Sequence, residues 1–483
     1  MDRRTFLSTA LSAGAAWFTG GSSRAAQEDL ASLTLAAASE RIRDGSISPV
    51  DLARACLDRI ERLNPKLNAF IRVTAEEALA DARRLEAEQK RGRFRGPLHG
   101  IPVALKDLID VRGLPTTAAS AVFEDRVARE DAPVVRRLRE QGAVLLGKLN
   151  MDEFAYNFTS ETSHFGPAHN PWDLERTPGG SSGGSAVAVA SRMCFGALGS
   201  DTGGSIRQPA AFCGIAGLKG SYGLVSTRGA VPLAWSLDHI GPMCRTVRDT
   251  ALLLQAIAGH DPDLPGSVRA KPPDYAAALS MDVSRFRLGV ARPFFFEDLD
   301  AEIADAVETA IRRLEKMTAG VRDVKLPPTD DVPVLVAEAY AYHEKRITEK
   351  GYLYHPLTLQ NILLGRDVSM PEYVRARRRL LELRREAARV LESVDLVLTP
   401  TTPRPPILLE LDQGKLPDIV LLRNAIPMNL YDLPTISVPC GFTRSGLPTG
   451  LQISGPRLQE PRVLALAHAY EQATEWHERT PPV

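Results

Sequence analysis

Two segments rich in glycine and serine constrain the fold of this chain most. They are TPGGSSGGS at 177–185 and GSDTGGSIR at 199–207. Each adjoins a pattern of buried structure, since an Ala/Val-rich helix is expected over 185–192 and a strand over 195–200. A flexible linker in such a place would leave backbone polar groups buried and unpaired. We therefore interpret both segments as structured loops, in which glycine allows a positive φ or the close approach of a ligand.

Strands and helices alternate around these loops. This alternation predicts an α/β fold with a mixed central β-sheet covered by helices on both faces. The 483 residues are expected to form a single large domain, with its core at about 96–265 and 391–483 and a helix-rich lobe at about 270–390. Further expected elements are a helix from Ser48 that ends at Asn64-Pro65, a helix at 133–141, and strands at 101–105, 143–149, 396–399, 435–439 and 450–453.

The first 26 residues have a different character. Arg3-Arg4 precede an uncharged stretch of apolar and small residues at 6–20, and Ala25-Ala26 offer a cleavage site. This layout predicts a twin-arginine signal peptide at 1–26, and hence a periplasmic or secreted protein. The apolar stretch is too short to cross about 30 Å of hydrocarbon, so no stable membrane insertion is expected after the signal is removed.

Composition excludes several classes of partner and cofactor. Lys+Arg and Asp+Glu both number 59, so no overall basic field attracts nucleic acid. The arginine-rich stretch 375–389 contains Glu382 and Glu386 and is interpreted as the solvated face of a helix. The five cysteines are scattered and are expected to be buried. There is no HExxH motif and no clustering of the nine histidines, so we predict neither a metal nor another cofactor.

The second glycine-rich loop has the character of an anion site. Consecutive backbone N–H groups in such a turn can surround an anion. A phosphate-binding loop would need GxxxxGK[ST], and no lysine follows either segment at that spacing. The oxyanion of an acyl-transfer intermediate fits better, because Ser205 directly follows the N–H groups of Thr202, Gly203 and Gly204. Ser205 is thus a candidate nucleophile and the three residues before it a candidate oxyanion hole.

A serine nucleophile needs a base, and the residues alone do not decide which side chain acts as that base. The segment 179–183 satisfies GxSxG, so a hydrolase elbow with His239 as the base is one alternative. The SxxK arrangement is excluded, because no lysine has a serine three residues before it.

Longer motifs resolve this choice by resemblance. GIPVALKD at 100–107, GKLNMDEF at 147–154, both glycine-rich segments, GLK at 217–219 and the stretch 429–452 all resemble the amidase signature family. The resemblance covers 30–483 and implies the fold of that family. By the same resemblance Lys106 corresponds to the catalytic lysine, Ser181 to a serine in cis-peptide geometry that relays protons, and Ser205 to the nucleophile. The residues that would support the nucleophile loop are Ser182, Asp201 and Arg207.

The resemblance implies a serine amidohydrolase that cleaves a small or aryl carboxamide to acid and ammonia or amine. For this chemistry Lys106 must be uncharged at neutral pH, which its place at the end of an apolar strand allows. The implied partner is a small-molecule amide, and a homodimer is compatible with the family. Specificity is expected from the helical lobe and from the loop at 408–422.

Two alternatives stay open. The first is the glutamine-hydrolysing A subunit of a tRNA-dependent amidotransferase, which has similar motifs at 150–154 and 200–205. The export signal, the absence of an expected Tyr-rich segment before Asp395, and Asp432 in a position where glycine is expected for such a protein all count against it. The second is a non-catalytic binding protein on the same scaffold, which the presence of all three catalytic candidates disfavours.

Overall fold

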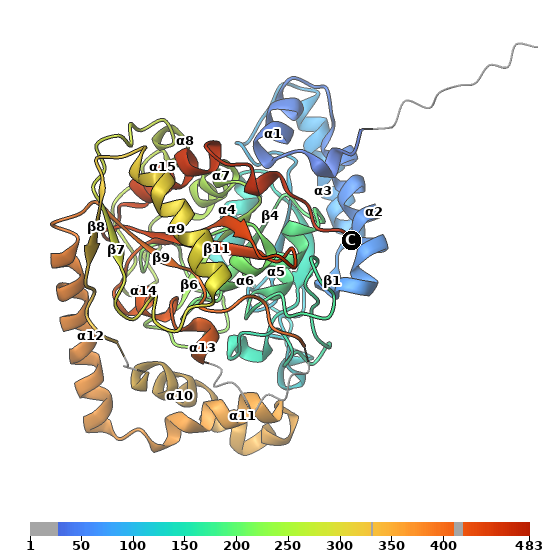
Figure 1. Cartoon of the computed structure of the whole chain (residues 1–483). Helices are drawn as coiled ribbons and strands as arrows, with labels where there is room; N and C mark the ends of the chain where they lie inside the picture. The colour runs from blue at the N-terminus through green and yellow to red at the C-terminus, as the bar shows by residue number, and fades with distance from the viewer. Residues whose placement is uncertain (1–27, 330–331, 410–418) are drawn as a thin grey trace, which may run out of the picture.

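A computed structural model describes residues 28–329, 332–409 and 419–483 (Figure 1). The predicted signal peptide and most of the loop at 408–422 lie outside this part of the chain. Within it, one mixed sheet of 11 strands has the order β1-β3-β2-β4-β6-β5-β10-β11-β9-β7-β8. The strands are β1 Phe70–Val73, β2 Pro102–Lys106, β3 Val144–Leu149, β4 Gly196–Asp201, β5 Ala216–Lys219, β6 His239–Cys244, β7 Leu288–Ala291, β8 Val321–Val324, β9 Leu396–Pro400, β10 Thr435–Phe442 and β11 Pro448–Ser454.

Helices flank this sheet, with α5 against β2, β4 and β6, and α9 and α15 against β10 (Figure 1). The expected α/β class with a mixed central sheet is confirmed. The helices are α1 Leu35–Arg43, α2 Pro49–Leu67, α3 Ala75–Gln89, α4 Pro133–Glu140, α5 Gly183–Ala190, α6 Arg207–Cys213, α7 Val247–Ile257, α8 Tyr275–Ala278, α9 Ala301–Glu315, α10 Pro333–Lys350, α11 Pro356–Leu363, α12 Met370–Val390, α13 Ile419–Leu422, α14 Ile426–Leu430 and α15 Glu460–Gln472.

Strand β2 is the centre of a parallel part of the sheet. It runs parallel to both neighbours, β3 and β4, with Leu105 opposite Leu198. The carboxyl ends of adjacent parallel strands lie at one edge, which is where α/β proteins bind ligands. Lys106 at the end of β2 is therefore brought close to Asp201 at the end of β4, although 95 residues separate them in sequence.

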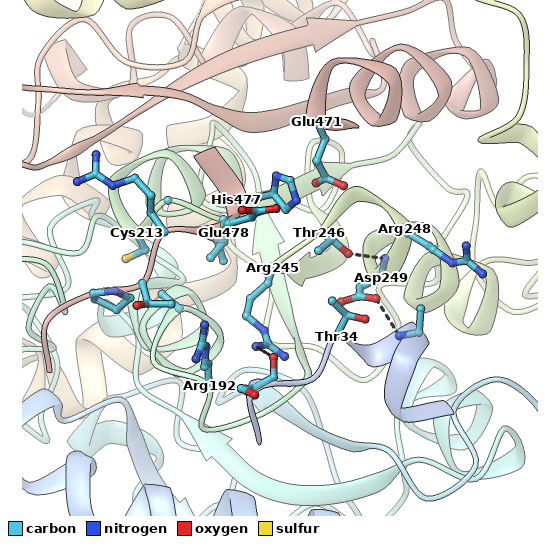
Figure 2. A pocket seen from close by; sticks show the side chains of 18 of the residues that line it. Thr34, Arg192, Cys213, Arg245, Thr246, Arg248, Asp249, Glu471, His477 and Glu478 are labelled. Carbon is cyan, nitrogen blue, oxygen red and sulfur yellow. Dashed lines mark hydrogen bonds between the residues drawn. The ribbon is translucent and has the colours of Figure 1, made fainter. Parts of the chain in front are cut away.

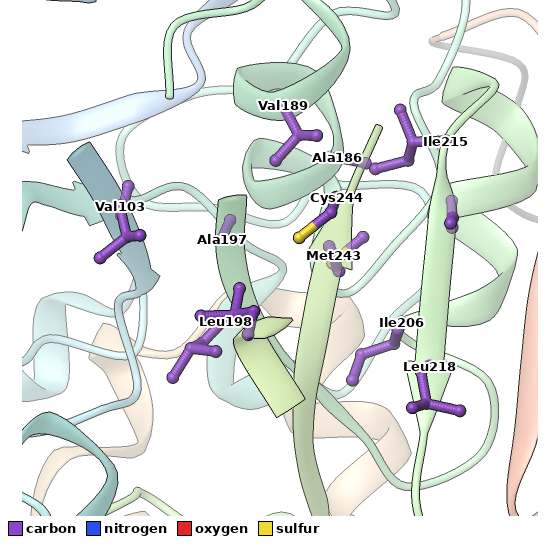
Figure 3. Packing of buried hydrophobic residues seen from close by; sticks show 14 of the residues in the cluster. Val103, Ala186, Val189, Ala197, Leu198, Ile206, Ile215, Leu218, Met243 and Cys244 are labelled. Atoms are coloured by element: carbon purple, nitrogen blue, oxygen red, sulfur yellow. The ribbon is translucent and has the colours of Figure 1, made fainter. Parts of the chain in front are cut away.

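The helix between the two glycine-rich loops is buried on every side. All eight residues of α5 are buried, and Ala186 and Val189 pack over the strands beside Ala197 and Met243 (Figure 3). Glycine is required at its start, because a Cβ on Gly184 would lie 2.5 Å from a carbonyl oxygen of the chain. The first loop is therefore held against the core, as predicted. The five cysteines are buried and unpaired.

The region 270–390 is more than a helical lobe. It contains α9 to α12, but β7 and β8 also belong to it and extend the central sheet, since β7 pairs with β9. Helices α10 to α12 lie together along one side of the molecule, at the bottom of Figure 1. The arginine-rich helix α12 pairs Arg378 with Glu382 and Arg379 with Glu386, as expected for a solvated face.

The first long helix starts as expected but ends later. The hydroxyl of Ser48 accepts the N–H of Asp51, whose carboxylate accepts the N–H of Ser48. The expected end at Asn64-Pro65 is wrong, because α2 continues to Leu67. Proline is tolerated in this last turn because the helix closes at Asn68, which is left-handed (φ 47°) and donates its N–H to the Asn64 carbonyl.

Candidate active site

Lys106 lies at the centre of a buried group of hydroxyls. Its side chain is inaccessible to solvent, and Nζ lies 2.7 Å from Ser181 Oγ, 2.9 Å from Ser182 Oγ and 2.9 Å from Ser200 Oγ. Strand β2 carries the lysine, the first glycine-rich loop carries Ser181 and Ser182, and β4 carries Ser200. The contact with Ser200 is not anticipated from the sequence.

Burial determines the charge of Lys106. It lowers the pKa of Lys106 to about 7, while Asp152, Asp201 and Asp238 act against it by favouring the charged form. A lysine in water titrates near ~10.4. The uncharged amine is therefore accessible to Lys106 near neutral pH.

The two serines of the first loop are fixed by the backbone around them. The peptide bond between Gly180 and Ser181 is cis. Ser182 Oγ donates to the carbonyl of Ser200 at 3.1 Å and accepts its N–H at 3.2 Å. The only hydroxyl hydrogen of Ser182 is thus committed, so this oxygen must accept from Lys106.

Ser205 lies on the second loop beside the first. Its side chain is almost buried, and its carbonyl accepts the N–H of Ser182 at 3.2 Å. Within the described part of the chain no hydrogen bond joins Ser205 Oγ to Ser181 Oγ. Such bonds often form only once substrate is bound. Ser205 instead faces a cavity, described below.

Asp201 holds the second loop in place. One carboxylate oxygen accepts the N–H of Gly204 at 2.8 Å and the other that of Ile206 at 3.2 Å. Arg207 pairs with both oxygens at 3.0 Å, and both side chains are fully buried. Burial alone would raise the pKa of Asp201, but the Arg207 cation and the other hydrogen-bond donors hold it well below its ordinary value.

Arg207 also joins this loop to the C-terminal part of the sheet. It donates to Asn429 Oδ1 at 2.6 Å, to Gln452 Oε1 at 2.7 Å and to the carbonyl of Ala425 at 2.9 Å. The amide of Asn429 in turn donates to Asp201 at 2.9 Å. The sequence motif at 429–452 contains two of these residues, but their contacts with the loop become visible only in the structure.

The structure changes the predicted oxyanion hole. The N–H of Gly204 already donates to Asp201, so this member of the predicted set is not free. No hydrogen-bond acceptor is found in the described residues for the N–H groups of Gly203 and Ser205. The backbone conformation needs glycine at 204, where φ is 126° and a Cβ would lie 2.5 Å from that of Ala425. Thr202 is held through its hydroxyl, which donates to Asp238 at 2.6 Å.

Two buried carboxylates near Lys106 are absent from the sequence prediction. Burial raises the pKa of Asp152 to about 6 even though Ser160 and Thr162 donate hydrogen bonds to it. Burial likewise raises the pKa of Asp238 to about 6, against the hydrogen bond from Thr202. Asp152 lies in one of the sequence motifs and could have been proposed from it. Asp238 lies in no such motif, and nothing in the sequence indicated that it would be near Lys106.

Among the described residues, no hydrogen bond joins the alternative base His239 to Ser181. Its Nδ1 lies 3.1 Å from the carbonyl oxygen of Asp201, and burial lowers the pKa of His239 to about 3. The hydrogen-bond partner of Ser181 is Lys106. The hydrolase-elbow interpretation is therefore wrong.

Two cavities flank the second loop. The Ser205 cavity, of about 180 Å³, is bounded by Ser205, Gly203 and mainly apolar side chains such as Leu335, Val336 and Ile426. None of the described side chains that line it is charged. The Ser200 cavity, of about 190 Å³, is lined by polar and apolar residues that include Ser200, Thr202, Ala230, Asp238 and His239. Ala155 and Leu233 border both cavities.

The described residues contain no group of three or more His, Cys, Asp or Glu side chains arranged to hold a metal ion. In the same part of the chain, no helix is both long and apolar enough to cross a membrane.

Comparisons with known proteins agree with this geometry. A family model described as Amidase matches residues 51–464. The chain is 41% identical to the A subunit of the glutamyl-tRNA(Gln) amidotransferase of Gloeobacter violaceus, covering 90% of this chain and 95% of that protein. The corresponding protein of Moorella thermoacetica is 42% identical, over 93% and 98% of the two chains. A solved crystal structure of an amidase superposes with a TM-score of 0.82 at 34% identity, over 91% and 99% of the chains. The chain therefore belongs to the amidase signature family.

Proposed function

We propose that this protein hydrolyses carboxamides through an acyl-enzyme on Ser205, with Ser181 and Lys106 transferring the protons. Its family is one of amide-hydrolysing serine enzymes. The observation that carries the proposal is the buried Lys106 amine, 2.7 Å from Ser181 Oγ, on the loop directly beside Ser205.

The hydrogen bonds of Lys106 fit an uncharged amine. Such an amine has two N–H groups and one lone pair. Ser182 must accept one N–H, and Ser200 is within reach of the second. The lone pair is then directed to Ser181, whose hydroxyl can donate to it and accept a proton from Ser205. This arrangement prepares Lys106 to act as the base.

The reaction then follows in two halves. Ser205 Oγ attacks the amide carbon while its proton passes to Ser181 and the proton of Ser181 passes to Lys106. The N–H groups of Gly203 and Ser205 stabilise the oxyanion. The same path returns the proton to the nitrogen, the C–N bond breaks, and the amine leaves. Water attacks the acyl-enzyme by the same route and releases the acid and free Ser205.

The two cavities suggest how the amide is oriented. The acyl group fits the Ser205 cavity, whose described lining is mainly apolar and carries no charge. The nitrogen side then points to the Ser200 cavity, where Ser200 contacts Lys106 and a buried carboxylate, Asp238, suits a polar or cationic product. We propose an apolar or aryl acyl group as the preferred substrate class.

Narrowing each cavity separately tests this orientation. Val336→Phe is expected to lower kcat/KM for benzamide by about tenfold and to leave acetanilide within about twofold, because only the first carries a large acyl group. Ala230→Phe is expected to give the reverse pattern, since it narrows the Ser200 cavity. Steady-state kinetics of both variants on both substrates provide the check. Equal losses on the two substrates would contradict the assignment.

A second candidate function is the glutamine-hydrolysing A subunit of a tRNA-dependent amidotransferase. The identity of 41–42% over at least 90% of the chain to proteins of that name favours it. The described lining of the Ser205 cavity speaks against it, because none of those side chains offers a charged partner for the α-carboxylate or the α-ammonium of glutamine. This candidate requires strict glutamine dependence and co-purification with partner subunits.

The presence of Asp432 where the amidotransferase subunit is expected to have glycine does not distinguish the two candidate functions. Asp432 is in the left-handed region with φ 58°, the conformation that glycine adopts easily. Its carboxylate accepts the N–H of Tyr222 at 2.8 Å and pairs with Arg457 at 2.8 Å. Asp432 thus adopts a backbone conformation that glycine favours, and its carboxylate has partners of its own.

An amide panel tests the proposed function. The wild type should release ammonia or arylamine from apolar amides such as benzamide faster than from glutamine. Ser205→Ala should lose this activity, because an alanine side chain offers no nucleophile. Equal rates for the two proteins would refute the proposal, and hydrolysis of glutamine alone would favour the amidotransferase candidate.

Export is a separate proposal, based on residues 3–26 and outside the described residues. Expression of the full chain in a bacterial host with a twin-arginine pathway, followed by fractionation, tests it. Mature protein in the periplasm that begins near residue 27 is expected. Uncleaved protein found only in the cytosol would contradict it.

A further inference from the structure

A third cavity of about 520 Å³ shares no lining residue with the two cavities beside Ser205 (Figure 2). It lies where the start of the described chain meets the end of α5, the end of α6, the start of α7 and the C-terminal residues. We call it the arginine cavity, because four arginines line it against three carboxylates: Arg192, Arg245, Arg248 and Arg479 against Asp249, Glu471 and Glu478.

Arg192 is the first unusual feature of this cavity. It follows α5 with φ 58°, a left-handed conformation that glycine adopts without cost and other residues do not. Its guanidinium has no hydrogen bond or ion pair to any residue that the structure describes. Burial and the nearby Arg59 cation lower the pKa of Arg192, while the Asp29 carboxylate, which pairs with Arg59, acts in the opposite direction. An arginine without a hydrogen-bond partner in the described residues thus occupies a backbone position that glycine would adopt more easily.

Arg245 provides a second guanidinium beside it. Nη1 donates to the carbonyl of Ser32 at 3.0 Å and Nη2 to that of Leu33, while the buried Nε finds no partner in the described chain. Burial lowers the pKa of Arg245, the Asp249 carboxylate acts against this, and the charge on Arg192 lowers the pKa further, in agreement with the side-by-side placement in Figure 2. Two cations that repel each other share one cavity.

The carboxylates that line the cavity are engaged by backbone N–H groups or lie at its rim, and none of them forms an ion pair with Arg192 or Arg245 in the described residues. The carboxylate of Asp249 accepts the N–H groups of Leu35 and Ala36, both at 3.0 Å, and Glu471 accepts the N–H of Val247 at 2.7 Å. Glu478 is exposed at the rim. His477 also lines the cavity, and its buried Nδ1 has no partner in the described residues. The unpartnered groups can all donate hydrogen bonds, and what is missing is an acceptor with negative charge.

We infer that the arginine cavity binds a small oxyanion, a phosphate or a carboxylate, between Arg192 and Arg245. Guanidinium groups match both anions through paired N–H donors. The anion would supply the missing acceptor for Arg192 and for Nε of Arg245 and would reduce the repulsion between the two cations. The site lies at the far ends of the two helices whose first turns adjoin Ser181 and Ser205, so it is separate from the amide site.

Calorimetric titration of the full-length protein with inorganic phosphate and with acetate tests the site. Saturable binding of either anion is expected, with Kd in the millimolar range or below at low ionic strength, about −4 kcal/mol or stronger. The tighter of the two anions identifies the preferred geometry. Ser205→Ala should bind equally well, which separates this site from the proposed function.

Matched arginine variants localise the binding. Arg192→Gly fits the left-handed backbone and should weaken binding by about tenfold or more, since it removes a paired donor. Arg248→Gln is the control, because Arg248 lines the same cavity but is exposed and paired with Glu40; it should change binding by less than about twofold. Arg192→Lys keeps the charge without the paired donors, so its loss of affinity should lie between those of Arg192→Gly and Arg248→Gln. No saturable binding of either anion up to about 50 mM, or equal losses in the Gly and Gln variants, would overturn the inference.

Discussion

Replacing Lys106 with methionine is expected to lower kcat/KM for a carboxamide by about 10³-fold or more, the usual effect of losing a catalytic base. Methionine fills a similar apolar volume but cannot accept a proton from Ser181. The loss should be smaller for an activated ester, because a phenolate leaving group needs no proton, whereas an amine does. Rates on an amide and an ester with the same acyl group measure the difference, and equal losses would contradict a role in leaving-group protonation.

The pH dependence of the wild type follows from the same residue. The pKa of Lys106 is lowered to about 7, and only the uncharged form can accept a proton. kcat/KM should therefore rise with pH through about 7 and level off above it, and at pH 6 it should be about one tenth of the plateau. In Lys106→Met this dependence should disappear from the residual rate.

The second large effect concerns stability. Arg207→Met is expected to lower the free energy of unfolding by about 3–5 kcal/mol, because it leaves the fully buried Asp201 without its counter-ion. Arg207 also donates to Asn429, Gln452 and the Ala425 carbonyl, so these acceptors lose their donor as well. A melting temperature lower by several degrees should result.

The size of this effect should depend on pH. At a pH above the ordinary pKa of aspartate, ~3.9, Asp201 is ionised in the unfolded variant. Folding must then either bury its carboxylate without a counter-ion or protonate it, and both cost free energy. The stability difference should therefore shrink as the pH falls toward 4. Arg248→Met is the matched control, since its ion pair with Glu40 is exposed and should contribute less than about 1 kcal/mol. Similar melting temperatures for both variants would contradict the role of Arg207.

Much of the site could be predicted from the sequence because its residues lie at the ends of recognisable strands or in the loops that follow them. Lys106 ends an apolar strand, and the two serine loops adjoin buried helices and strands, so parallel pairing of β2 and β4 brings them together. The two glycine-rich loops could also be recognised as structured from the sequence, because their glycines are conspicuous. The structure shows why glycine is needed at Gly184 and Gly204: a Cβ there would come too close to other parts of the chain.

The features that sequence could not predict depend on long-range contacts. Asn429 and Gln452 reach Arg207 across more than 200 residues, and no local pattern indicates such contacts. The bond from Gly204 N–H to Asp201 depends on the exact path of the loop, so the oxyanion hole could be placed only approximately. Strands β7 and β8 are four residues each, too short to stand out against the surrounding helices.

The central claim is that an uncharged Lys106, acting through Ser181, activates Ser205. The rate at which a fluorophosphonate labels the protein, followed against pH and located by peptide mass spectrometry, tests it most directly. Labelling is expected at Ser205, with a rate that falls about tenfold for each pH unit below 7 and is nearly abolished in Lys106→Met. Labelling at another residue, or a rate at Ser205 that changes neither with pH nor with loss of the lysine, would contradict it.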